Sequence, residues 1–270
     1  MWEKIRRIWS IAELRKSILF VLWMLVAFRL VAHIPLPGVN AENLRAFLAG
    51  NQVLGILNVF SGGTIENFSV VMLGIAPYIT ASIIFQLLTM VVPKLEELSK
   101  EGESGQQKIN MYTRIATVPL AFLQAFGFLQ LLSRSQASIF TTSSNTQLVT
   151  MMLLVTAGTV FLMWIGELIT EKKIGNGISL LIFAGIVAGL PGAVRNAWVN
   201  YTPSDLYTYV LFAALAIVTI VGVVIISEGQ RNIPVSYAKQ IRGGRVLGAA
   251  TTHLPLRVNM AGVIPIIFAI

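Results

Sequence analysis

The chain has 270 residues, of which 55% are hydrophobic and 12% are charged, and its formal net charge is +8. A water-soluble chain carries about 25% charged residues, so this one has too few polar side chains to cover a water-facing surface. Cysteine is absent, and neither an HExxH motif nor a GxxxxGK[ST] loop occurs. The composition therefore indicates a membrane protein and excludes disulfides, thiolate catalysis, a zinc-protease site and nucleotide hydrolysis by a phosphate-binding loop.

The first 16 residues form a basic, amphipathic segment. Its apolar residues recur at helical spacing and basic residues stand between them: Trp2, Ile5, Ile8, Trp9 and Ala12 alternate with Lys4, Arg6 and Arg7. This pattern predicts a helix lying on the cytoplasmic leaflet. Such a helix either only anchors the chain or also docks a partner.

Long apolar runs follow, and about 20 such residues suffice to cross the ~30 Å hydrocarbon core of a bilayer. The predicted spans are 17–34, 75–92, 115–133, 147–169, 178–194 and 206–227, and a seventh run begins near residue 258. The first run lacks a small-residue cleavage site, so it is predicted to be a retained span. The sequence thus predicts six spans and the start of a seventh.

Residues 53–92 are too long for one span and contain polar and helix-breaking positions. Gly62, Gly63, Glu66 and Asn67 interrupt the run before Gly74. The simplest interpretation is a polar half-helix over 61–71, followed by a full span. A half-helix must be shielded by protein or line a cavity, as in channels and transporters. An external loop touching the membrane is the alternative, and the pattern alone leaves both open.

Basic residues indicate the orientation in the membrane. Sixteen of the twenty Lys and Arg residues lie in the N-terminal segment and in every second connection, whereas the alternate connections hold Arg45, Arg134 and Arg195. Because cytoplasmic loops carry the excess of positive charge, this distribution predicts a cytoplasmic N-terminus.

The connection over 228–258 is unusually basic and rich in glycine. Arg242 and Arg245 flank a Gly-Gly pair. Positive charge here either only enforces membrane topology or forms a docking element for an acidic or nucleic-acid partner.

Ionisable and small residues in the spans have mainly structural interpretations. Glu167 and Glu171 stand one turn apart, but beside basic residues at a cytoplasmic helix end, so interfacial charge is favoured over paired catalytic carboxylates. Acids deep in the spans, which proton-coupled carriers use, are missing. Gly158, Gly185 and Gly189 are predicted to allow close packing of helices.

Several stretches, in chain order, resemble the SecY family, the central subunit of the bacterial protein translocase. They are Phe28-Arg29 with Ile34-Pro35-Leu36-Pro37-Gly38, Gly74-Ile75-Ala76-Pro77-Tyr78 with Gln86-Leu87-Leu88, Glu101-Gly102-Glu103-Ser104-Gly105, Gly175-Asn176-Gly177-Ile178-Ser179, Tyr237-Ala238-Lys239, and His253-Leu254-Pro255-Leu256-Arg257 continuing to Pro265. The resemblance implies an all-α, polytopic helical bundle with ten spans in two inverted halves. This chain would then hold the five-span first half over 17–194 and the beginning of the second half over 195–270, and it reaches the seventh span.

The resemblance also implies roles for particular residues. A plug half-helix precedes the second span, and it maps to Ser61, Gly62, Gly63, Thr64, Ile65, Glu66, Asn67 and Phe68. An aliphatic pore ring maps to Ile79, Ile83, Ile182 and Ile267. The loop over 228–258 maps to a docking loop for the ribosome or the SecA motor, with Lys239, Arg242, Arg245 and Arg257 as its contacts.

The function that the resemblance implies is a protein-conducting channel in the cytoplasmic membrane, without enzymatic activity and without a cofactor or metal. The implied partners are small subunits of the SecE and SecG type, SecA, ribosomal RNA, signal peptides, nascent chains and membrane lipids. A secondary transporter of small solutes is the alternative, and it would need a polar site at mid-membrane. A structural scaffold is a third interpretation, and it gives no reason for a polar half-helix.

Overall fold

The computed structural model describes residues 10–50, 58, 61, 63–133, 140, 145–202, 206–236, 240–242, 245–247 and 251–257. Contacts within the chain divide it into two compact units, Met1–Asn196 and Ala197–Ile270. The chain passes from one to the other in the last turn of a helix.

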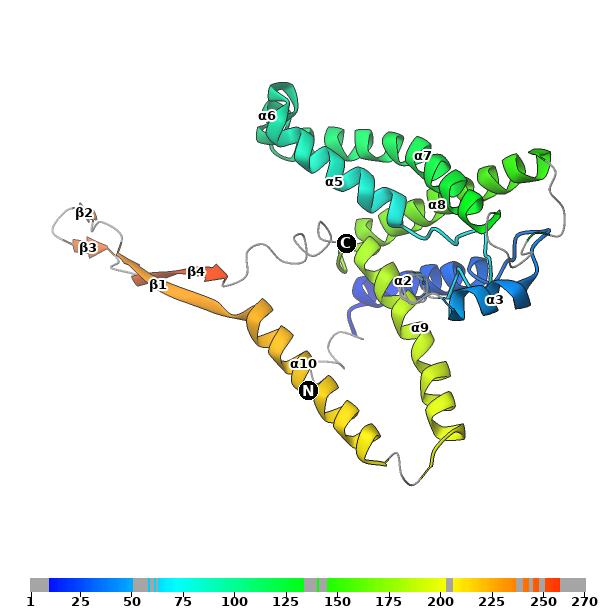
Figure 1. Ribbon diagram of the computed structural model, residues 1–270. Coiled ribbons are helices and arrows are strands. Elements are labelled where there is room, and N and C mark those ends of the chain that lie inside the picture. Colours follow the sequence, from blue (N-terminus) through cyan, green and yellow to red (C-terminus); the bar gives the residue numbers. More distant parts are fainter. Residues whose placement is uncertain are drawn as a thin grey trace. The chain divides into compact units, whose positions relative to one another are not determined.

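The first unit is a bundle of helices (Figure 1). In chain order they are α2 (Ala12–Val31), α3 (Ala41–Ala49), α5 (Ala76–Val91), α6 (Pro93–Lys100), α7 (Glu103–Ser133), α8 (Asn145–Glu171) and α9 (Gly177–Val199). A helix occupies each of the five apolar runs predicted for this part of the chain. Their ends differ from the predicted ones by a few residues, except for α7, which begins much earlier.

The connection between the second and third predicted spans is not a simple loop, because it contains the helix α6 and the first part of α7. Val92 leaves the helical region with φ −98° and ψ 110°, and Pro93 then opens α6. Because proline fixes its own φ and disfavours a helical residue before it, the chain bends by 102° here. Gly105, in the first turn of α7, lies against the Leu98 carbonyl of α6, where a side chain would overlap with it.

Four helices in the described part of the chain are long and apolar enough to cross a membrane, namely α7, α8, α9 and α10 (Leu206–Glu228). The bent pair α5–α6 makes a fifth if it is counted as one span. The 20-residue α2 falls outside this set because both of its ends are charged, from Glu13 to Lys16 and at Arg29. The chain is thus a multi-pass membrane protein.

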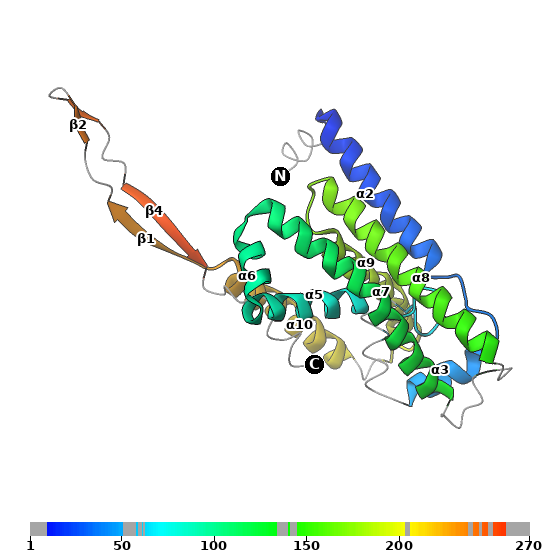
Figure 2. The ribbon, with the colours of Figure 1, turned by 90° about the horizontal axis from the view of Figure 1, so that it is seen from above.

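Helix α8 lies at the centre of the first unit. It contacts α2, α5 and α7, and α5 also packs along α7 (Figure 2). The buried residues of α7 recur every fourth position from Ile109 through Thr113, Thr117 and Ala121 to Ala125, so one face of this helix is buried. Most remaining apolar surface is exposed, as expected where lipid rather than water is the solvent.

Two hydrophobic clusters fill the unit. We define the first cluster as the one containing Leu44, Ile65, Phe68, Leu129 and Val155. The second cluster contains Val21, Phe28, Val71, Ile75, Leu162, Ile165, Ile169 and Leu181. Residues from the polar segment before α5 therefore enter both clusters.

The second unit combines α10 with a β-hairpin. Strand β1 (Gln230–Ser236) pairs antiparallel with β4 (Thr251–Arg257), and β2 (Gln240–Arg242) pairs with β3 (Arg245–Leu247). The register of the longer ladder runs from Gln230 opposite Arg257 to Ser236 opposite Thr251. The described part of the connection expected to be a docking loop thus forms a two-stranded ribbon, and the otherwise helical fold includes these four strands.

Candidate functional site

The segment before α5 consists of turns over residues 63–75 instead of the expected half-helix. The N–H of Asn67 donates to the Gly63 carbonyl, four residues back, at 3.3 Å. The next two amides bond three and five residues back instead, so the helical pattern does not continue. Positive φ angles at Gly63 (78°), Phe68 (43°) and Gly74 (56°) interrupt helical geometry. Part of this difference has a physical cause, because the Phe68 carbonyl and the Val70 N–H bond to a neighbouring chain segment instead of within a helix.

That neighbour is the connection after α2. Leu36 N–H donates to the Phe68 carbonyl at 2.9 Å, and Val70 N–H donates to the Ile34 carbonyl at 3.1 Å. The Ser69 hydroxyl donates to the Val31 carbonyl at 3.0 Å and accepts from the Val71 N–H at 3.2 Å. The C-terminal half of the segment is therefore fixed to the end of α2.

The same segment is buried although much of it is polar. Thr64 and Ser69 are 0% exposed, and Phe68 is 2% exposed and meets Phe140 edge to face with ring centroids 6.2 Å apart. The Thr64 hydroxyl donates to the Ser61 carbonyl at 3.1 Å, so its burial leaves it satisfied. A polar segment packed inside an apolar bundle fits the shielding that a membrane requires.

Of the residues assigned to the plug, Ser61 and Gly63 to Phe68 are described, whereas Gly62 lies outside the described residues. Ile65 and Phe68 belong to the first cluster. Asn67 and Glu66 are half-buried, and the Glu66 N–H donates to the Asn58 amide oxygen at 3.0 Å. The location of this segment next to a constriction stays a prediction.

Two of the four predicted pore-ring residues pack against the same hydrophobic cluster. Ile79 in the first turn of α5 and Ile182 of α9 are both half-buried and pack against the second cluster. Ile83, one turn further along α5, is half-buried but does not belong to that cluster. Ile267 lies outside the described residues. Whether these side chains face one pore stays a prediction.

An ion pair connects the cytoplasmic ends predicted for α7 and α8. Arg114 Nε pairs with Glu167 Oε1, and the glutamate side chain is only 21% exposed. Glu171, by contrast, is exposed at the end of α8, and Lys172 lies over the Phe20 ring at 4.8 Å. No pattern in the sequence indicated Arg114 as the partner of Glu167.

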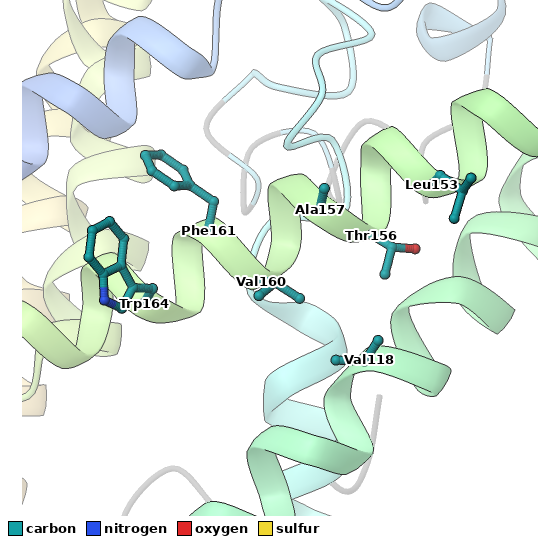
Figure 3. Close-up of a pocket in the computed structure, with 7 residues that line it drawn as sticks. All are labelled: Val118, Leu153, Thr156, Ala157, Val160, Phe161 and Trp164. Carbon is teal, nitrogen blue, oxygen red and sulfur yellow. The ribbon is translucent and has the colours of Figure 1, made fainter.

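An apolar groove of about 610 Å³ follows α8 (Figure 3). Its lining comes from α8 except for Val118 of α7: Leu153, Thr156, Ala157, Val160, Phe161 and Trp164. The Thr156 hydroxyl donates to the Met152 carbonyl at 2.8 Å, so it is already satisfied within the helix. Apart from the Trp164 indole N–H, the groove therefore offers apolar contact.

The docking residues lie on the ribbon of the second unit. Arg242 and Arg245 are opposite each other at the closed end of the β2–β3 ladder. Arg257 ends β4 opposite Gln230, and Lys239 lies outside the described residues. The pairing of β2 with β3 thus brings Arg242 and Arg245 to the same end of this ladder.

In the described part of the chain, no three His, Asp or Glu side chains lie close enough together to hold a metal ion. The candidate sites are therefore the buried turn segment with the helices packed on it in the first unit, and the basic ribbon of the second unit.

Comparisons with known proteins agree with this geometry. The sequence model of the SecY family matches residues 69–270. Two curated relatives named protein translocase subunit SecY are 48% identical over 264 residues, in Pseudomonas aeruginosa, and 47% identical over 267 residues, in Escherichia coli K12. Each match covers 96% of this chain, and 59% and 60% of the relative. The chain therefore spans about three fifths of the length of these curated relatives.

Two solved structures share the fold. One is described as the structure of a protein conducting channel, with a TM-score of 0.57, 19% identity and coverage of 88% of this chain and 51% of that one. The other is Sec61 in the canine ribosome-channel complex from the endoplasmic reticulum, with a TM-score of 0.52, 18% identity and coverage of 81% and 48%.

Proposed function

We propose, from the premise that the chain belongs to the SecY family, that it forms the pore wall of a protein-conducting channel for secretory and membrane proteins. The observation that carries this proposal is the polar turn segment, which is buried in a membrane bundle and continues directly into α5. It is supported by the fold shared with a protein-conducting channel. The transporter alternative lacks comparable support, because the lining of the groove on α8 is apolar apart from the Thr156 hydroxyl, which is bonded within the helix, and the Trp164 indole N–H.

The pore is tested by polar substitutions in the full-length subunit. We expect Ile79→Ser and Ile182→Ser to raise the ion conductance of reconstituted channels, because packed aliphatic side chains seal a constriction by excluding water. Matched controls are Ile84→Ser and Ile186→Ser, whose side chains are 38% and 37% exposed. Equal conductance in the ring variants and the control variants would show that Ile79 and Ile182 do not line a pore.

The buried turn segment is proposed to be the plug. Its burial among α3, α7 and α8 side chains supports this role, because displacement of such a segment would open space inside the bundle. We expect deletion of residues 61–67 to raise resting conductance while transport continues. Transport lost together with an unchanged resting conductance would contradict the plug assignment.

The basic ribbon is proposed to dock the ribosome or the SecA motor in the cytoplasm. The opposed Arg242 and Arg245 support this role, because guanidinium groups bind phosphates and carboxylates bidentately. Arg→Glu at both positions should abolish partner binding, and Arg→Lys should weaken it, while membrane orientation survives both. Unchanged affinity in the double Arg→Glu variant would leave the ribbon only a topological role.

Further partners and the location are proposed from the family. They are small SecE- and SecG-type subunits, SecA, signal peptides, nascent chains and lipids, with the chain in the cytoplasmic membrane and its N-terminus inside the cell. No enzymatic step is proposed, because the driving force would come from the ribosome or the motor.

A further inference from the structure

Gly158 of α8 lies directly against the main chain of the turn segment. A Cβ atom added to Gly158 would overlap with the Val70 carbonyl oxygen and lie 2.9 Å from its carbon. Since this contact is with main-chain atoms, no rotamer change on Val70 can relieve it. Only a shift of the segment or of α8 would make room for a side chain.

Val70 is held from the opposite side as well. Its N–H donates to the Ile34 carbonyl at 3.1 Å, and the preceding Ser69 is bonded to the end of α2. The peptide units on both sides of Val70 are therefore clamped between α8 and the connection after α2. Its neighbour Val71 is 0% exposed, whereas Val70 itself is half-buried.

This clamp lies shortly before α5. Only turns separate Val70 from Ala76, where α5 begins, and Ile79 stands in the first turn of that helix. Ile75 and Ile79 both pack with α8 residues in the second cluster. A displacement at Val70 would thus be passed along a short, buried stretch to the start of α5.

The other close glycine contact of α8 differs in kind. A Cβ added to Gly166 would lie 3.1 Å from Ile178 Cγ1 and 3.5 Å from Leu181 Cδ1, which are side-chain atoms of α9, and at the ordinary contact distance of 3.6 Å from Ile178 N. A methyl group is easier to accommodate there than against a carbonyl. We therefore expect an alanine substitution to displace more of the structure at Gly158 than at Gly166.

We infer that Gly158 is a positioning residue for the closed channel. Its missing side chain lets α8 hold the Val70 main chain, and the clamp fixes both the turn segment and the start of α5. This inference rests on the proposed function, because it names the contact that keeps the proposed plug and the Ile79 side of the proposed pore in place.

The test compares alanine substitutions in the full-length subunit. Gly158→Ala is the test variant, and Gly166→Ala is the control on the same helix. Gly127→Ala on α7 is the second control, because a Cβ there meets no atom within 4 Å. The chain has no cysteine, so a single Asn67→Cys can report the exposure of the turn segment to a thiol reagent.

We expect Gly158→Ala to raise the rate of Asn67→Cys labelling and the resting ion conductance by about tenfold, the scale of an overpacking cost. Both controls should stay within about twofold of the parent. Raised labelling with unchanged conductance would keep the positioning role and contradict the channel proposal. Unchanged labelling would overturn the positioning role, whatever the conductance.

A second variant covers the case in which Gly158→Ala does not accumulate. Combining it with Val70→Gly removes the Val70 side chain, whose Cγ1 would lie 3.0 Å from the new Cβ, and frees the main chain to move. We expect this double variant to accumulate and to label at the raised rate. Labelling at the parent rate, or failure to accumulate alongside normal controls, would overturn the inference.

Discussion

At the scale of single residues, Ser69 has the clearest energetic role. It is 0% exposed, and its hydroxyl bonds both the Val31 carbonyl and the Val71 N–H. We expect Ser69→Ala to lower the free energy of unfolding by roughly 1–3 kcal/mol, because the buried Val71 N–H loses its acceptor. Denaturant unfolding in detergent measures this. The exposed Ser133, whose hydroxyl donates to Gln130, provides the control, and Ser133→Ala should change stability by less than about 0.5 kcal/mol.

The Arg114–Glu167 pair is a second residue-scale test. The carboxylate is mostly buried, so Arg114→Met should destabilise the protein by about 1.5–3 kcal/mol. A double-mutant cycle with Glu167→Gln should give a coupling energy of at least about 0.5 kcal/mol.

The matched control is the exposed Lys100–Glu96 pair within α6, at 2.6 Å, for which the same cycle should give less than about 0.5 kcal/mol. Equal coupling in the two pairs would mean that burial adds nothing to the first.

Residue-level prediction from sequence succeeded where the cause is local. Lys172 and Lys173 near the end of the helix favoured interfacial charge over a catalytic role for Glu167. Its partner could not be found, because Arg114 belongs to another helix and only packing brings the two together. The same limit applies to Ser69, whose acceptor lies at the end of α2.

At the scale of elements, the sharp corner between α5 and α6 depends on a close contact. Gly105→Ala would place a methyl group onto the Leu98 carbonyl, so we expect a loss of about 1–3 kcal/mol and faster amide hydrogen exchange over α6. Gly189→Ala on α9 is the control, because a Cβ there meets no atom within 4 Å. Unchanged exchange over residues 93–100 would show that Pro93 alone maintains the bend.

Apolar helices were predictable because hydropathy is a local property, whereas strands and turns depended on distant partners. No strand was expected in the connection over 228–258, yet Gln230 pairs with Arg257 near its other end. The segment before α5 was expected to be a half-helix, but its Val70 N–H and Phe68 carbonyl bond to Ile34 and Leu36. The broken character of this region was visible in its glycines and polar residues, but its geometry was not.

At the scale of the whole molecule, the distribution of positive charge predicts the orientation in the membrane. Ser104 and Asn200 are both exposed and lie on connections expected to face opposite sides. In intact cells, a membrane-impermeant maleimide should label Asn200→Cys and should reach Ser104→Cys only after the membrane is opened. The cysteine-free parent gives the background. The reverse labelling pattern would overturn the assigned orientation.

The two prolines of the long β-ladder bear on how a partner can bind the ribbon. Pro234 of β1 stands opposite His253, and Pro255 of β4 stands opposite Asn232. Proline lacks an N–H and is tolerated in a strand where its nitrogen faces away from the paired strand, so both edges of the ribbon miss a donor. A polypeptide that tried to extend this sheet would lose a hydrogen bond on either side. Recognition through side chains avoids this loss, and the prolines disfavour edge-to-edge pairing of the long ladder with its own copies.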